Sequence, residues 1–367
     1  MIHMTINSIF NMAPRISRSI KRSFLLIKKK MERCPYSPVS LTLPFYLPTS
    51  LSSEKVLQEL KTLNGFSFLP NYGNMGDIVI AMAEYQFFEK HGLKYEVFRN
   101  RTSQDNLVYG GGGLFIRDWK RCYQQILKLF QKKHLKRIII LPSSFHDCPD
   151  LLEAIDERFT VFCREEKSRD YLLSSGAKGK VILAHDMALF LMEIFQNTKL
   201  PIRYGFKQVW QQITDSVSRL THQEGHVVAY FLRTDSESNT DWKKIGLQST
   251  LDLSLCTCSD SRDKDEVSFY TKLFFAGIDM ADIVVTDRLH VGICSMLAGK
   301  EVFLLDNSYG KVSGVYERSM KQSPRVHFVD DVQKLPGILG RTIAEGKVQR
   351  TANLNNLEKI GEVLTRS

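Results

Sequence analysis

The chain has 367 residues, of which 43% are hydrophobic and 25% are charged, and its formal net charge is +10. This length and composition are typical of a globular protein with room for two α/β domains, and they exclude fibrous, repeat and low-complexity proteins. The first 33 residues carry +7 of the +10, so the rest of the chain is nearly balanced and we expect it to bind no nucleic acid.

Residues 1–50 are predicted to form a basic N-terminal arm. Eight lysines and arginines stand against Glu32 alone in its first 33 positions, which gives 8 − 1 = +7. No run reaches the roughly 18 apolar residues of a membrane span, and Ile20–Ile27 is too short and too interrupted for a signal peptide. We therefore expect a cytoplasmic protein. The arm is either irregular or a basic amphipathic helix that touches anionic lipid at the inner face of the membrane.

The seven cysteines predict neither a disulfide framework nor a metal site. Only Cys256 and Cys258 are close in sequence, and no second pair is present to complete a zinc site with them. We expect reduced, mostly buried thiols, no bound metal and no cofactor.

The first βα unit is predicted from the strand Phe66–Leu69, the loop Pro70–Asp77 and the helix Ile78–Lys90. Two glycines in the loop would let a ligand approach the backbone, and the helix N-terminus would offer free N–H groups. The glycine spacing does not match a dinucleotide or ATP site, and an ordinary glycine-containing turn would look similar. The polar candidates for ligand binding in this loop are Asn71, Asn74 and Asp77.

Four consecutive glycines, Gly110–Gly113, follow the strands predicted at Tyr95–Phe98 and Leu107–Tyr109. Each ordered glycine costs about 0.5 to 1 kcal/mol relative to alanine, which a purely structural turn would not require. The usual benefit is close approach of the backbone to a bound molecule. We therefore interpret Gly111 and Gly112 as part of a binding surface.

Two more strands of the first half are predicted to end in polar residues. The apolar strand Arg137–Leu141 leads into a loop, Pro142–His146, whose side chains suit sugar hydroxyl groups, although a loop histidine is more often structural. The strand Phe159–Cys163 ends at Arg164, which either faces a crevice or pairs with a neighbouring carboxylate on the surface. The loop candidates are Ser143, Ser144 and His146, and the surface partners of the arginine would be Glu165 or Asp170.

The segment 197–225, which contains Pro201 and Gly205, is predicted to link two halves of the chain. The strand Val227–Leu232 then restarts the alternation of strands and helices, as two stacked α/β domains would, and it ends in Arg233. We expect a further helix over Val267–Phe275 and a C-terminal helix within residues 341–367.

The stretch Gly277–Glu317 is predicted to be a βαβ unit that carries the reactive centre. A buried strand, Ile283–Val285, is followed by turn or cap residues, by helical spacing up to Gly299 and by a second strand, Val302–Leu305. In an open parallel sheet, ligands bind outside the carboxyl ends of the strands, beside free helix N–H groups. The residues after these two strands should therefore meet at one crevice.

Three side chains of this unit, Arg288, His290 and Lys311, are the candidates for chemistry at that crevice. Two cations and a titratable imidazole suit an anionic substrate that also needs a proton moved. A surface arginine, a capping histidine and a solvated loop lysine are the alternative.

Five segments, taken in order between about Asn71 and Glu317, resemble the polysaccharide pyruvyl transferase family. An aspartate followed by apolar residues, in His185–Leu189, is also similar to that family. The five segments are the N-x-G-D pattern at Asn74–Asp77, the four glycines followed by Leu114 and Phe115, the R-x-x-x-S pattern at Arg164–Ser168, the string T-D-R-L-H at Thr286–His290, and the Tyr-Gly-Lys that ends at Lys311.

The resemblance implies an α/β architecture of two Rossmann-like domains that face each other across a cleft, as in GT-B glycosyltransferases. Residues 51–196 would form the acceptor side and residues 226–340 the donor side. The implied reaction joins the pyruvyl group of phosphoenolpyruvate to a saccharide diol, gives a pyruvate ketal and inorganic phosphate, and serves exopolysaccharide or cell-surface glycan synthesis.

That reaction assigns a role to each candidate. His290 would protonate the methylene carbon, while Arg164, Arg288 and Lys311 would hold the carboxylate and the departing phosphate. Arg233 is a weaker candidate for the same donor pocket. The acceptor would face Asn71–Asp77, Gly110–Gly113 and the residues that follow Pro142, and a lipid-linked acceptor would suit a basic arm on the membrane.

Two other functions fit the same residues. A nucleotide-sugar glycosyltransferase of GT-B type would share the fold and would also use an arginine and a lysine for its leaving diphosphate. A non-catalytic scaffold of a sugar-assembly complex would keep the fold and bind through its basic arm.

Overall fold

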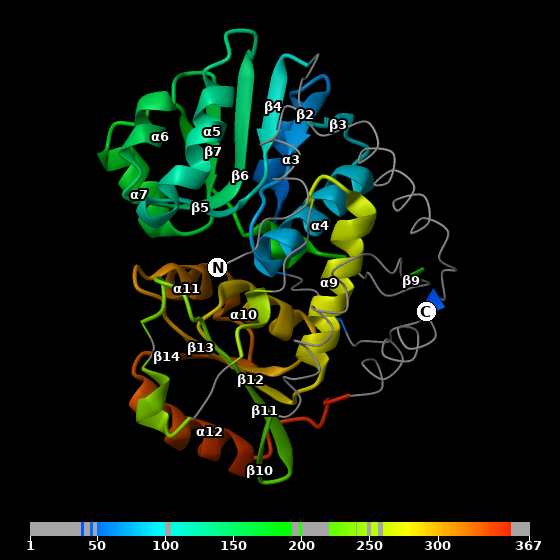
Figure 1. The fold of residues 1–367 in the computed structure, drawn as a ribbon, viewed down its shortest axis with the longest axis vertical. Coiled ribbons are helices and arrows are strands. Elements are labelled where there is room, and N and C mark those ends of the chain that lie inside the picture. Colours follow the sequence, from blue (N-terminus) through cyan, green and yellow to red (C-terminus); the bar gives the residue numbers. More distant parts are fainter. Residues whose placement is uncertain are drawn as a thin grey trace, which may run out of the picture.

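The computed structural model describes residues 38–39, 45–46, 50–99, 104–192, 198–199, 220–239, 241–247, 251–255 and 260–353 (Figure 1). Most of the predicted basic arm and linker, the C-terminal helix expected after residue 353, and Cys256 and Cys258 lie outside them. Within the described residues, no helix is both long and apolar enough to cross a membrane. The cysteines there are free thiols, at Cys122, Cys148, Cys163 and Cys294.

The first half of the chain forms a sheet whose described strand pairs are all parallel. Its strands are β2 (Phe66–Leu69), β3 (Tyr95–Val97), β4 (Asn106–Tyr109), β5 (Gly112–Ile116), β6 (Arg137–His146), β7 (Phe159–Cys163) and β8 (Lys180–Leu183). They lie in the order β3-β2-β4-β6-β7-β8, with β5 paired to β6. The helices of this half are α3 (Glu54–Lys61), α4 (Met75–Lys90), η1 (Arg117–Trp119), α5 (Lys120–Phe130), α6 (Pro149–Ala154), α7 (Glu166–Ser174) and η2 (Met187–Phe190).

The second half forms a sheet in the order β10-β11-β12-β13-β14. The strands are β10 (Thr221–Gln223), β11 (His226–Phe231), β12 (Ile283–Thr286), β13 (Glu301–Leu305) and β14 (Val326–Val329). Only β10, at one edge, is antiparallel among these described pairs. The helices are η3 (Trp242–Ile245), η4 (Leu253–Leu255), α9 (Lys264–Asp279), α10 (Leu289–Leu297), α11 (Lys311–Val315), the π-helix η5 (Tyr316–Met320), η6 (Val332–Lys334) and α12 (Leu335–Ala344). A separate two-stranded ribbon pairs β1 (Pro38–Val39) with β9 (Thr198–Lys199).

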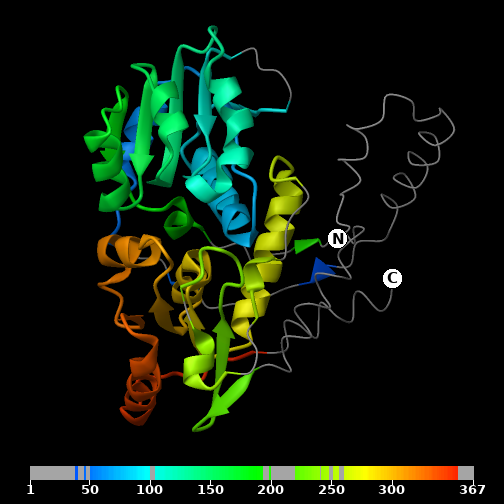
Figure 2. The same ribbon diagram turned by 60° about the vertical axis from the view of Figure 1, so that its left-hand side comes forward.

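The two halves share one hydrophobic core, in which α4 packs against α9 (Figure 1). Phe68 and Phe88 of the first half and Phe274 and Leu297 of the second belong to this single cluster of buried side chains. Because α4 is covered by its own sheet and by α9, it is apolar on nearly all sides, as buried helices are. In both views, α10 and α11 lie on the side of the second sheet that faces the first half, so the strand ends of the two halves meet there (Figures 1 and 2).

The alternation of parallel strands and helices confirms the predicted mixed α/β class. The strand Phe66–Leu69 and the strand Phe159–Cys163 occur with the predicted bounds. The predicted strand–helix–strand unit of the second half also occurs, as β12, α10 and β13.

The loop predicted at Pro142–His146 is wrong, because β6 continues through His146. The strand β5, which the glycine run leads into, pairs with this extension through Gly112 and Ser143 and through Phe115 and Phe145. Proline lacks an N–H donor, and Pro142 lies where the register of β6 shifts against β7, between Ile140 and Ser143.

The predicted start of α4 is also wrong, since the helix begins at Met75 rather than Ile78. Asn74 and Asp77 form a capping box, in which each side chain accepts a hydrogen bond from the backbone at the other's position. In the second half, the N-cap of α10 is Arg288, while Thr286, predicted as a turn or cap residue, still belongs to β12.

Candidate active site

The predicted acceptor loop is held together by hydrogen bonds within itself. The Asn74 side chain accepts a hydrogen bond from Gly76 N at 2.8 Å, and Asn74 N donates to Asp77 Oδ2 at 3.1 Å. Asn71 Nδ2 donates to Asp77 Oδ1 at 3.3 Å and Asn71 Oδ1 accepts from Tyr109 Oη at 2.8 Å. The three predicted residues therefore lie together, each with a structural partner, and their role toward an acceptor stays a prediction.

Three of the four consecutive glycines are explained by contacts within the chain. A Cβ atom on Gly110 would lie 2.6 Å from Asn71 N, and one on Gly111 would lie 2.5 Å from Pro142 O. Gly112 has a φ of 145° and a Cβ there would lie 2.3 Å from Asn71 Nδ2, so a side chain is excluded by conformation and by space. The backbone approach that the sequence predicts is thus made to other parts of the chain.

Gly113 differs from its neighbours because no backbone lies against it. A Cβ atom there would lie 3.3 Å from Arg164 Nη2 and 3.6 Å from Lys311 Nζ. The absence of a side chain at Gly113 lets two cationic groups approach the same point of the backbone.

Glu84 supports the glycine run from α4. Its carboxyl group is fully buried and accepts a hydrogen bond from Gly111 N at 2.7 Å. Burial raises the pKa of Glu84 well above its ordinary value, which favours the protonated form. The sequence signal for this residue is a single carboxylate within the apolar run Ile78–Phe88.

Arg164, at the end of β7, is fully buried rather than on the surface. Its Nη1 donates to Asp186 Oδ2 at 2.7 Å, and its Nε donates to Ser144 Oγ at 2.8 Å. Burial lowers the pKa of Arg164, but Asp186 and Glu165 more than compensate, so the guanidinium stays charged. The third nitrogen, Nη2, is buried without a hydrogen-bond partner among the described residues and is the nitrogen that faces Gly113.

His290, the second residue of α10, lies between the two halves. Its Nε2 lies 3.3 Å from Asp186 Oδ2 and 3.4 Å from Arg164 Nη1. Burial acts to raise the pKa of Asp186, but His290 and Arg164 hold it well below its ordinary value. The other ring nitrogen, Nδ1, lies against Gly76 at the first turn of α4, where a Cβ atom would come within 2.3 Å. An anchored imidazole beside a buried arginine is the geometry expected of a proton-transfer group.

The residues after β6 divide between the interior and the surface. Ser143 Oγ donates to Leu141 O at 2.8 Å, and Ser144 Oγ donates to Glu165 Oε2 at 3.1 Å, so both hydroxyls are buried and engaged. His146 is exposed, and its ring stacks on that of Tyr309 with the centroids 5.3 Å apart. Only the histidine of this predicted set is open to a ligand.

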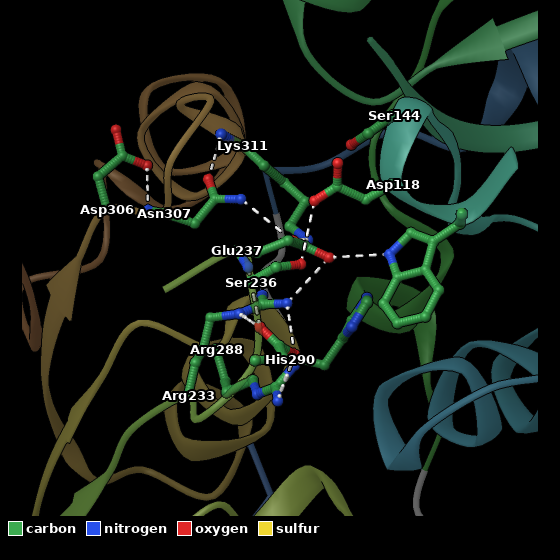
Figure 3. A network of polar contacts seen from close by, with 12 residues as sticks. Asp118, Ser144, Arg233, Ser236, Glu237, Arg288, His290, Asp306, Asn307 and Lys311 are labelled. Carbon is green, nitrogen blue, oxygen red and sulfur yellow. Dashed lines mark hydrogen bonds and ion pairs between the residues drawn. The ribbon is translucent and has the colours of Figure 1, made fainter. Parts of the chain in front are cut away.

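Arg288 and Arg233 are paired with carboxylates of the second half (Figure 3). Arg288 Nε donates to Asp252 Oδ1 at 3.0 Å, and its Nη2 lies 2.8 Å from Asp235 Oδ2. Arg233 donates twice to Asp235, at 2.8 Å and 3.0 Å. Both arginines are buried, so a ligand at either one would compete with an existing ion pair.

Lys311, at the start of α11, is buried with Glu237 as its partner (Figure 3). Its Nζ donates to Glu237 Oε2 at 2.8 Å, and the same carboxylate accepts from Trp119 Nε1 of the first half at 3.1 Å and pairs with Arg233 at 2.9 Å. Burial lowers the pKa of Lys311 to about 8, with Glu237 opposing the shift and Arg233 and Arg164 adding to it. This lysine is therefore a cation whose charge changes in a mildly alkaline range.

A family model described as polysaccharide pyruvyl transferase matches residues 74–309, which is more than half of the chain. The chain belongs to the polysaccharide pyruvyl transferase family. Arg164, Asp186 and His290 fall within that match, whereas Asn71 and Lys311 lie just outside it. As a member of this family the protein is a transferase.

Similar proteins agree with the assignment to the pyruvyl transferase family. The putative pyruvyl transferase EpsO of Bacillus subtilis (strain 168) is 27% identical over 298 residues, which cover 72% of this chain and 88% of that protein. General stress protein 30 of the same strain is 24% identical over 312 residues, 75% of this chain and 83% of that protein. A crystal structure of a functionally uncharacterised protein from Klebsiella pneumoniae subsp. pneumoniae NTUH-K2044 matches with a TM-score of 0.56 and 28% identity, over 76% of this chain and 97% of that chain.

The polar residues of this candidate site that were not predicted include Asp186, Tyr309 and Glu237. Asp186 stands in the segment that resembles the family, and Tyr309 stands in the Tyr-Gly-Lys string, so both had a signal in the sequence. Glu237 had none, because its importance depends on cations up to 74 residues away. Among the described residues, no group of histidines, cysteines and carboxylates could hold a metal ion.

Proposed function

We propose that this protein transfers the pyruvyl group of phosphoenolpyruvate to two hydroxyl groups of a saccharide and releases inorganic phosphate, in exopolysaccharide or cell-surface glycan synthesis. The observation that carries the proposal is the Arg164–His290 pair, together with Lys311, which approaches the same glycine as Arg164. Arg164 Nη1 lies 3.4 Å from His290 Nε2, and a Cβ atom on Gly113 would lie 3.3 Å from Arg164 Nη2 and 3.6 Å from Lys311 Nζ. Family membership and the name of the EpsO relative support the same chemistry.

The proposed reaction needs one proton added to carbon and one C–O bond broken. Protonation of the methylene carbon makes it a methyl group and leaves the adjacent carbon electron-deficient. Two acceptor oxygens form bonds to that carbon, and its bond to the phosphate oxygen breaks. Of the two protons that the acceptor hydroxyls lose, one balances the new C–H bond and the other leaves with the phosphate.

Each predicted residue takes a part in this proposal. His290 protonates the methylene carbon, and Asp186 orients its ring. Arg164 and Lys311 bind the anionic groups of the donor, and the charge that develops on the departing phosphate strengthens these contacts in the transition state. Arg288 and Arg233 complete the donor side, where Asp235 and Asp252 now occupy them.

The acceptor side of the proposal is the first half of the chain. Asn71, Asn74, Asp77 and the glycine run would line it, with His146 at its rim, so that two Rossmann-like domains face each other in a GT-B arrangement. The basic arm, which lies outside the described residues, would bring the protein to the inner face of the membrane if the acceptor is lipid-linked.

Phosphate release tests the proposal. Purified protein is mixed with phosphoenolpyruvate and a panel of saccharides, and in parallel with UDP-sugars and the same panel. We expect phosphate only when phosphoenolpyruvate and a suitable diol are both present, with a pyruvate ketal in the product by mass spectrometry. Release of UDP without consumption of phosphoenolpyruvate would establish a glycosyltransferase instead. Absence of binding to either donor by calorimetry would favour the scaffold.

A further inference from the structure

Tyr309 is held in place by its ring while its hydroxyl group has no partner. The ring stacks on that of His146 of the first half, with an interplanar angle of 9°. Lys311 Nζ lies 5.2 Å from the centroid of the Tyr309 ring. The phenolic oxygen is buried, yet it makes no hydrogen bond among the described residues. Buried hydroxyl groups nearly always have a partner, so an unpaired one at a candidate active site points to a ligand.

A second unpaired donor belongs to the same site. Arg164 Nη2 is buried without a partner in the described part of the chain, and it is the nitrogen that lies nearest to Gly113. Burial and the Glu237 carboxylate raise the pKa of Tyr309 well above its ordinary value of about 10, while Arg164 acts in the opposite direction. The phenol is therefore a hydrogen-bond donor at neutral pH and lies within electrostatic reach of that arginine.

We propose that Tyr309 Oη, Arg164 Nη2 and Lys311 Nζ form one subsite over Gly113 that binds the phosphoryl group of the donor. This inference rests on the proposed function and adds to it the residue and the part of the donor. Three donors, one after β7 and two from the Tyr309–Lys311 segment, match the three terminal oxygens of a phosphoryl group, whereas a carboxylate offers only two. The subsite then holds the phosphate as its bond to carbon breaks.

The variant Tyr309→Phe removes only the hydroxyl group. The phenyl ring keeps the stack on His146 and the contact with Lys311, and no hydrogen bond within the described chain is lost. We therefore expect an unchanged or slightly higher melting temperature. Affinity for phosphoenolpyruvate and for inorganic phosphate should fall about 10- to 100-fold, the scale of a lost hydrogen bond to a charged group. The matched control is Tyr316→Phe. Tyr316 lies in η5 and its ring stacks on Phe328 of β14, so this variant should change neither the melting temperature nor the affinities.

Calorimetry with three probes separates the possible outcomes. In Tyr309→Phe, the affinities for phosphoenolpyruvate and for inorganic phosphate should fall by the same factor. Pyruvate, which has only the carboxylate, should bind as it does to the wild type. A lower affinity for pyruvate with an unchanged affinity for phosphate would overturn the phosphoryl assignment. If Tyr309→Phe binds each of the three probes as tightly as the wild type does, or melts at a lower temperature than the wild type, Tyr309 is not part of the subsite. A wild type that binds phosphate but not phosphoenolpyruvate would refute the proposed function and leave the phosphate subsite supported.

Discussion

The charge on Lys311 should limit donor binding as the pH rises through about 8. Burial depresses the pKa of this lysine from 10.5 to about 8, so roughly nine-tenths of the ammonium is present at pH 7 and about 3% at pH 9.5. The donor's phosphate ionises near pH 6 and is constant over this range. Loss of one charge-assisted hydrogen bond is worth about 1.5 to 3 kcal/mol, so the affinity for phosphoenolpyruvate should fall about 10- to 150-fold and then level off.

The measurement is calorimetric binding of phosphoenolpyruvate between pH 7 and 10, in the wild type and in Lys311→Arg. The arginine stays charged throughout, so the variant should bind with a flat profile, at whatever affinity its geometry permits. Unfolding does not explain a fall in the wild type, because the unfolded chain keeps this proton up to pH 10.5 and the group therefore favours the fold more as the pH rises from 8. A flat wild-type profile, or the same fall in Lys311→Arg, would refute the reasoning.

Three further predictions concern single side chains around the same space. Gly113→Ala should place a methyl group about 3.3 Å from Arg164 Nη2 and raise the KM for phosphoenolpyruvate at least several-fold with little change in Tm. Gly340→Ala, where nothing lies within 4 Å, should leave the KM unchanged and raise Tm slightly, because alanine favours the helix α12; a KM of Gly113→Ala equal to that of the wild type would mean that the donor does not approach Gly113. His290→Gln should keep donor binding by calorimetry but lower single-turnover phosphate release by roughly 100-fold, and near-normal turnover would exclude it as the general acid. Asp186→Asn should leave the Arg164 guanidinium with only the more distant Glu165 carboxylate, at 3.9 Å, as a partner. It should lower the free energy of unfolding by about 3 to 5 kcal/mol in urea titrations, a loss that a surface pair would not show.

Strand positions were predictable because the hydrophobic pattern is local. Runs such as Phe159–Cys163 and Ile283–Val285 are short, apolar and bounded by polar residues, and they form strands near those bounds. Arg164 and His290 were each predictable as strand-end residues for a related reason, since parallel strands bring the residues after them to one edge of a sheet. Their distance of 3.4 Å joins two different sheets, however, and depends on how α4 packs against α9.

Several partners of the cations could not be predicted, because they are far from the cations in the sequence. Asp252 precedes Arg288 by 36 residues, and no periodic pattern connects them. The extension of β6 through His146 could not be predicted for the same reason, since it depends on pairing with β5. The glycine run shows the limit of a composition argument: four glycines indicate close approach, but only the structure separates Gly113 from the others.

The ion pairs also set an order in which a donor can enter this site. Arg233, Arg288 and Lys311 are compensated by Asp235, Glu237 and Asp252, so a phosphate or carboxylate that binds at Arg288 has to displace a buried carboxylate first. Breaking one partner from a buried pair costs about 3 to 5 kcal/mol unless the new ligand replaces it fully. Arg164 Nη2 and the Tyr309 hydroxyl carry no such cost, because neither has a partner among the described residues. The donor should therefore anchor there first, and Arg288 should contribute only after the carboxylates of the second half rearrange around it.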